Sequence, residues 1–233
     1  WFIVDLQRAK KTLSTRLEQA GSANGTRPRP VCANAEQCLD SPIIRTHVPS
    51  QRIHTMAGRG LPNEVDPIAD GRIETFRDYQ WKAAVEPLHT DKETACVGLS
   101  MSCASAYLEA FPQARVGLLP SAVGGTPLSR WMPGEDLYKR ALGIAQEALK
   151  RGKLKAILWH QGETDAQTLE LAQSYGQRLA EMVSTLRQAL DATNVPFIVG
   201  GLDDFLADHP TCVHYGLVKD ALQSLNVDRC GFA

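Results

Sequence analysis

The chain has 233 residues, of which 43% are hydrophobic and 22% are charged, and its formal net charge is −1. This length and composition fit one globular domain with a full core. The near-neutral charge leaves no basic surplus to attract nucleic acid, and no apolar run approaches the roughly 18 residues that span a bilayer. We therefore expect neither nucleic acid nor a membrane as a partner. The first residue is Trp1 rather than Met, so the compartment and any targeting segment stay open.

Cysteine spacing gives no sign of a metal site. The six cysteines are Cys32, Cys38, Cys96, Cys103, Cys212 and Cys230, and no two of them form a C-x-x-C pair. That pattern argues against a zinc knuckle or a redox pair, so no metal and no cofactor are expected. Two interpretations stay open: free or partly buried thiols throughout, or a Cys32–Cys38 disulfide, which would require an oxidising compartment.

The first fifty residues carry weak indications of order. Phe2, Leu6, Leu13 and Leu17 approximate helical spacing, so a short amphipathic helix is expected within residues 1–20. The next thirty or so residues turn to Gly, Ser, Asn, Pro and isolated charges, a composition that buries little apolar surface. We therefore expect residues 1–50 to form a weakly ordered extension and residues 51–233 to form the domain.

Helical and strand patterns then alternate three times along the chain. The helices are predicted at 100–111, 135–151 and 169–190, and the strands that follow them at 115–119, 154–159 and 196–200. Such alternation predicts right-handed crossovers and an α/β fold, a three-layer, doubly wound parallel sheet with helices on both faces. Ligands of such sheets bind beyond the carboxyl ends of the strands, so function is expected in loops 121–131 and 160–165.

Both loops have compositions suited to a polar site. Gly124 and Gly125 follow a strand, where the backbone can approach a ligand and direct N–H groups at an oxyanion; a plain tight turn is the alternative. Residues 159–165 read Trp-His-Gln-Gly-Glu-Thr-Asp and place an amide and carboxylates directly after a buried strand. The alternative for this segment is a helix N-cap, with Thr164 or Asp165 capping the next helix and Glu163 in solvent.

Several segments occur in the order and approximate spacing of a known family. They are Met56–Gly60, Trp81, Glu86–His89, Val97-Gly98, Val116–Thr126, Trp131, Leu137-Tyr138 and Leu158–Asp165. Together they resemble the sialate O-acetylesterase-like family, which includes carbohydrate esterase family six, over roughly residues 56–225. The resemblance implies a serine esterase of the SGNH-hydrolase type on a flavodoxin-like sheet. Its substrate would be an acetylated carbohydrate, such as acetylated xylan or sialic acid.

The chain departs from the family pattern where catalysis needs it most. In the family, Gly-Gln-Ser-Asn directly precedes Met-Ala-Gly-Arg-Gly and supplies the nucleophile, and a later Asp-x-x-His supplies the base and its orienting carboxylate. Here the first stretch reads Arg52–Thr55, which places His54 at the nucleophile position, and no Asp-x-x-His occurs. The domain is therefore expected to be an altered, C-terminally incomplete member of the family.

The resemblance also assigns the remaining site residues. His54, Gly124, Gln161 and Glu163 are expected to converge, with the Gln161 amide and the Gly124 backbone as oxyanion donors and Glu163 as a brace. Substitutes for the lost groups are weaker. Ser100 lies in a segment like a nucleophile elbow and is interpreted as a helix N-cap, and His209 is expected in solvent.

Two functions stay open from the sequence. One is a carbohydrate acetylesterase in altered form, without activity because it lacks the triad. The other is a non-catalytic carbohydrate-binding relative that keeps the pocket loops. The sequence identifies neither the sugar nor the oligomeric state.

Overall fold

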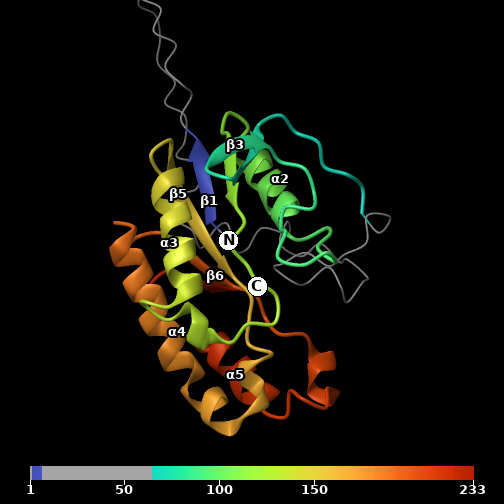
Figure 1. Cartoon of the computed structure of the whole chain (residues 1–233), viewed down its shortest axis with the longest axis vertical. Helices are drawn as coiled ribbons and strands as arrows, with labels where there is room; N and C mark the ends of the chain where they lie inside the picture. The colour runs from blue at the N-terminus through green and yellow to red at the C-terminus, as the bar shows by residue number, and fades with distance from the viewer. Residues whose placement is uncertain (1, 7–64) are drawn as a thin grey trace, which may run out of the picture.

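A computed structural model describes residues 2–6 and 65–233, whose strands form one sheet flanked by helices (Figure 1). The strands are β1 (Phe2–Leu6), β2 (Ile73–Arg77), β3 (Gln80–Ala83), β4 (Val116–Leu119), β5 (Gly152–Trp159), β6 (Phe197–Val199) and β7 (Cys230–Phe232). They lie in the order β3-β2-β4-β1-β5-β6-β7. The helices are α2 (Ser100–Ala110), α3 (Asp136–Ala148), α4 (Leu169–Ala189) and α5 (Tyr215–Gln223), with short 3₁₀ helices η3 (Leu128–Trp131), η4 (Asp165–Gln167) and η5 (Asp204–Asp208).

Helices cover both faces of the sheet, as predicted. The apolar face of α2 packs on one side, through Met101, Ala104 and Leu108, while buried residues of α3, α4 and α5 pack on the other (Figure 1). The three predicted helix–strand units are present as α2–β4, α3–β5 and α4–β6. The α/β fold is therefore confirmed, because each unit is specified by local periodicity.

The sheet is mostly parallel rather than wholly so. The strands β2, β4, β5, β6 and β7 share one direction, whereas β1 runs antiparallel to both its neighbours β4 and β5, and β3 runs antiparallel to β2. Two antiparallel strands are thus added to the predicted parallel arrangement, and one of them occupies a central position.

The helix predicted within residues 1–20 is wrong for Phe2–Leu6, which form the central strand β1. Phe2, Val4 and Leu6 pack into the core on the α3–α4 side, and Ile3 packs on the α2 side. A strand buried on both faces reads as a continuous apolar run, and such a run overrides the approximate helical spacing. The rest of the expected extension lies outside the described residues.

Gly152 provides the close approach that seats β1. A Cβ at this position would lie 2.3 Å from Val4 Cγ1 and 2.8 Å from the Asp5 carbonyl oxygen. Any larger residue would therefore push β1 away from β5. The preceding helix, predicted to run to residue 151, ends at Ala148, and Gly152 is the first residue of β5.

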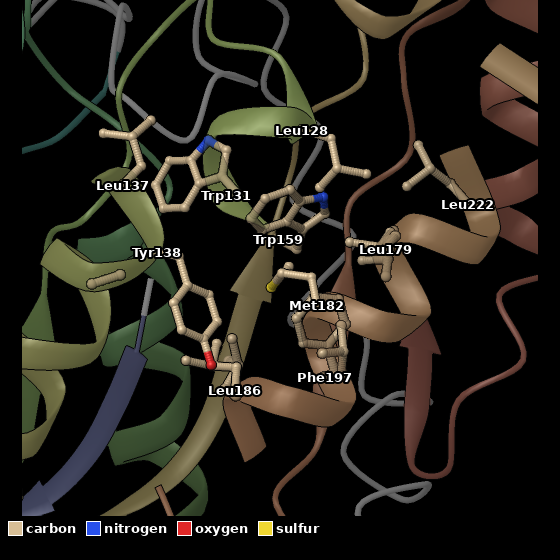
Figure 2. Close-up of a cluster of buried hydrophobic side chains, with 14 of the residues drawn as sticks. Leu128, Trp131, Leu137, Tyr138, Trp159, Leu179, Met182, Leu186, Phe197 and Leu222 are labelled. Atoms are coloured by element: carbon tan, nitrogen blue, oxygen red, sulfur yellow. The ribbon is translucent and has the colours of Figure 1, made fainter. Parts of the chain in front are cut away.

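The larger part of the core surrounds Trp159 at the end of β5. Figure 2 shows Trp159 between Trp131 and the side chains of Met182 and Phe197. The rings of Trp159 and Trp131 meet edge to face, with centroids 5.5 Å apart and an interplanar angle of 87°. Because Trp131 belongs to η3, this contact anchors the loop after β4 on the last residue of β5.

Candidate functional site

The loops that follow β4 and β5 meet at the carboxyl edge of the sheet. The Gln161 side-chain Nε2 donates to the Thr126 carbonyl oxygen at 3.1 Å, and the Leu128 N–H donates to Asp165 Oδ2 at 2.8 Å. The two loops therefore lie together, as expected for parallel strands whose carboxyl ends share one edge, whereas the convergence of the four assigned site residues stays a prediction.

A small pocket of about 50 Å³ lies between the two loops. Its lining consists of Ala122, Val123, Thr126, Trp131, Leu158, Trp159, His160 and Gln161. The Thr126 hydroxyl donates to the Val123 carbonyl at 2.9 Å and accepts from Trp131 Nε1 at 3.1 Å. This hydroxyl is already bonded on both sides, so it contributes little free hydrogen-bonding capacity to the pocket wall. Five of the eight lining residues are apolar or aromatic, while Thr126, His160 and Gln161 are polar.

Both hydrogens of the Gln161 side-chain amide are bonded within the protein. Its Nε2 donates to the Thr126 carbonyl and to Asp165 Oδ2, the latter at 2.7 Å, and its Oε1 lies 3.0 Å from the Tyr175 hydroxyl. Burial raises the pKa of Tyr175 far above its usual range, so its hydroxyl keeps its single hydrogen, for which the Gln161 backbone carbonyl at 2.6 Å and Oε1 at 3.0 Å are both acceptors. An oxyanion that uses the Gln161 amide would have to replace one of these bonds.

The expected donor at Gly124 also has a partner. Its backbone N–H donates to Asp91 Oδ2 at 2.9 Å. The next residue, Gly125, has a φ of 76°, in the region where only glycine is unstrained. Sequence reasoning did not place Asp91 at the site, because it lies in a loop far from Gly124 along the chain; its position just after Glu86–His89 was the one available indication.

Glu163 lies in the same loop as Gln161, where its Oε2 accepts from the Gly162 N–H at 3.1 Å. Its carbonyl oxygen accepts from the Cys212 thiol at 3.6 Å, which links the loop to the segment before α5. These contacts are those of a residue that shapes its own loop. The predicted role of Glu163 as a brace stays a prediction.

The sequence offered Asp165 either as a carboxylate of a polar site or as a helix cap, and the capping interpretation is wrong for this residue. The side chain is completely buried, and its carboxylate is paired with Arg178 at 2.8 Å. The residue that caps α4 is Thr168, whose hydroxyl accepts from the Leu171 N–H at 3.4 Å. Thr164 occupies the N-cap position of the short helix η4 without a side-chain hydrogen bond, and Asp165 is the first residue of η4, so neither caps α4.

The other candidates do not join this site within the described residues. His54 and the Met56–Gly60 segment lie outside them. Ser100 is the first residue of α2, behind Leu99 at the N-cap position, so its predicted capping role is wrong. The Ser100 hydroxyl is buried without a hydrogen-bond partner in the described part of the chain. His209 is exposed, as expected, with its Nδ1 3.0 Å from the Thr211 hydroxyl.

Three further features of the described residues are their possible metal ligands, their cysteines and the length and polarity of their helices. Between residues 65 and 233 and within 2–6, no group of His, Cys, Asp and Glu side chains is arranged to hold a metal ion. Four cysteines in these ranges are free thiols: Cys96, Cys103, Cys212 and Cys230. The helices of the same ranges are too short or too polar to cross a membrane.

Comparisons with known proteins match the chain to esterases. The family model described as "Carbohydrate esterase, sialic acid-specific acetylesterase" matches residues 55–231. An Arabidopsis thaliana protein named "Probable carbohydrate esterase" is 33% identical over 187 residues, which cover 68% of this chain and 72% of that protein.

Two solved structures share the fold. The X-ray structure of the same Arabidopsis protein has a TM-score of 0.65 at 29% identity, over 71% of this chain and 69% of that one. The crystal structure of NanS has a TM-score of 0.62 at 19% identity, over 76% of this chain and 72% of that one. At the latter identity the likeness supports the fold alone.

Proposed function

Because the chain belongs to the sialic acid-specific acetylesterase family of carbohydrate esterases, we propose that its pocket binds the acetyl group of an acetylated carbohydrate. We further propose that the chain, with its present sequence, does not turn the ester over. The observation that carries the first part is the pocket between the loops after β4 and β5, walled by Trp131 and Trp159.

The size and walls of the pocket suit an acetyl group. A single water needs about 10–15 Å³ of such space, so a pocket of about 50 Å³ takes only a few heavy atoms. Ala122, Val123 and Leu158 add apolar surface to the two tryptophans, which favours a methyl group over a charged one. Larger acyl groups would have to displace the Trp131–Trp159 contact.

The absence of turnover follows from the chemistry of a serine nucleophile. A Ser hydroxyl attacks an ester only when an oriented histidine takes its proton, and His54 stands where the family has that Ser. The hydroxyls of Ser100 and Ser121 are buried without a hydrogen-bond partner in the described residues, so no histidine there activates either one. Loss of triad members lowers kcat by about 10⁴ to 10⁶.

Two measurements test the proposal together. Titration calorimetry with an acetylated xylo-oligosaccharide should show binding that the deacetylated oligosaccharide does not, while p-nitrophenyl acetate should be hydrolysed no faster than by buffer. The variant Ala122→Leu fills the pocket and should abolish the preference; the matched control Ala207→Leu, at an exposed position of η5, should keep it. Equal binding of both oligosaccharides, or hydrolysis that a serine-directed phosphonate abolishes, would contradict the proposal.

A further inference from the structure

Asp165 is a charged group held completely out of solvent. Burying a carboxylate is costly unless its charge is paired and its oxygens accept hydrogen bonds. Both conditions are met: Arg178 Nη2 donates to Oδ1 at 2.8 Å, while the Leu128 N–H at 2.8 Å and Gln161 Nε2 at 2.7 Å donate to Oδ2. The three donors come from three separate segments, namely α4, η3 and the loop after β5.

Arg178 is itself fixed to α4. Its Nε donates to the Ser174 hydroxyl at 3.1 Å, and its Nη2 donates to the Leu171 carbonyl at 2.9 Å. Its side chain retains only 19% of its exposure, so solvent has limited access to compete for the guanidinium. The position of the Asp165 carboxylate is therefore set by a long helix rather than by a loop.

The negative charge of Asp165 selects one orientation of the Gln161 amide. A flipped amide would place Oε1 against the Asp165 carboxylate and the Thr126 carbonyl, and would turn Nε2 toward the Tyr175 hydroxyl. The amide oxygen would then face the Asp165 carboxylate and the Thr126 carbonyl, neither of which can donate a hydrogen bond. The observed orientation is therefore strongly favoured. In this orientation Gln161 holds Thr126 through its second hydrogen, and Thr126 belongs to the opposite wall of the pocket.

We propose that Asp165, neutralised by Arg178, is a positioning residue that fixes the Gln161 amide and the loop after β4, and with them the width of the pocket. Asp165 does not line the pocket, so it acts through Gln161 and Leu128. The effect of Asp165 on ligand binding rests on the proposed function, because it requires that the pocket binds an acetyl group. The effect of Asp165 on the orientation of Gln161 does not depend on that function.

The test uses the variant Asp165→Asn, which keeps the side-chain shape and removes the charge. One Asn oxygen cannot replace both carboxylate oxygens, so one donor must face the new NH₂ group. In ¹H–¹⁵N spectra of the unliganded chain, the Gln161 side-chain NH₂ resonances should shift and broaden. Binding of the acetylated oligosaccharide should weaken about tenfold, as expected for a lost bond to a charged group. Asp204→Asn, at an exposed carboxylate paired with Lys219, should change neither readout.

A second variant keeps the test decisive if Asp165→Asn does not fold. Arg178→Met leaves Asp165 in place but removes its counter-charge, and the same Gln161 resonances should move. Unchanged Gln161 resonances in the folded variants would overturn the proposal, and a loss of stability alone would then mark Asp165 as merely structural. If the unmodified chain binds no acetylated oligosaccharide, the proposed function fails, while the spectra still decide the role of Asp165.

Discussion

The Asp91 carboxylate accepts the hydrogen bond of the Gly124 backbone N–H, at 2.9 Å. This N–H is the group that family resemblance assigns to the developing oxyanion of an ester. A carboxylate oxygen resembles an oxyanion in charge and in hydrogen-bond preference, so Asp91 places an internal anion on that donor. A ligand oxygen has to compete with Asp91 for the same hydrogen.

The variant Asp91→Ala should therefore have opposite effects on binding and stability. Removing the carboxylate frees the Gly124 N–H, so the acetylated oligosaccharide should bind up to about tenfold more tightly. The fold should lose about 1–2 kcal/mol, because a part-buried hydrogen bond to a charged group disappears. Calorimetric titration and urea unfolding measure the two quantities. Weaker binding would show that Asp91 holds the loop in its binding form instead of competing with the ligand.

The variant Gly162→Ala should destabilise the fold by about 1–3 kcal/mol. Gly162 has a φ of 153°, and an added Cβ would lie 2.6 Å from Val218 Cγ1, a fully buried β-branched side chain. Gly143→Ala is the matched control, since nothing lies within 4 Å of its added Cβ in α3. That change should stabilise by about 0.5–1 kcal/mol, as expected for Ala over Gly inside a helix. Urea unfolding curves that move in the same direction for both variants would contradict this prediction.

Glu86 should make stability fall as pH rises above the pKa of an unfolded glutamate. Burial raises the pKa of its carboxyl, against the opposing effect of hydrogen bonds from the Leu88 and Gly98 N–H groups and the charge of Arg77. The folded state then binds the proton more tightly than the unfolded chain, so this contribution is complete below the unfolded pKa of about 4.3. The stabilising contribution of Glu86 is lost as pH rises through the raised pKa of its carboxyl in the folded state.

Glu86→Gln removes this titration. The unfolding free energy of the unmodified chain minus that of the variant should decrease as pH rises above the unfolded pKa of about 4.3. Asp70 provides the opposite case, because hydrogen bonds from Arg72 lower its pKa. The corresponding difference for Asp70→Asn should decrease as pH falls through the acidic range. A flat profile for Glu86→Gln would show that the burial of Glu86 does not affect its protonation.

The Cys103 thiol should resist alkylation in the folded chain. Burial raises its pKa to about 11, so at about pH 8 only about one thiol in a thousand is the reactive thiolate. Iodoacetamide labelling followed by peptide mass spectrometry should therefore be slower by on the order of a hundredfold than in denaturant, where the pKa returns to about 8.5. Equal labelling rates in the two conditions would show that the thiol is accessible in the fold.

Local patterns explain which elements were predictable from the sequence. The helices α2, α3 and α4 repeat apolar residues with helical period, and the strands that follow are short apolar runs between turn residues. The β2–β3 hairpin gave no such pattern. Its turn residues Asp78 and Tyr79 both have positive φ, at 53° and 58°, but they lack the glycine that usually marks such a turn.

The site residues also differ in how far the sequence could identify them. Gln161, Glu163 and Gly124 were identified because they belong to contiguous motifs that resemble a family. Asp165 lies in one of those motifs, yet its function depends on Arg178, one helix further along, and on a backbone N–H of η3. Asp91 likewise acquires its partner only when two distant loops meet. Such pairings are set by tertiary packing, which spacing along one sequence does not report.

Because β1 lies at the centre of the sheet, a fragment of the domain that lacks it should not form the sheet correctly. Its partners β4 and β5 come much later in the chain, so closing the sheet needs contacts of high sequence separation, which form slowly. A fragment that begins at the family motifs near residue 56 would leave β4 and β5 with unpaired edges facing an apolar gap. Unpaired edges of this kind recruit strands from other molecules. Such a fragment should aggregate, and adding the peptide Phe-Ile-Val-Asp-Leu in trans is the direct means of restoring it.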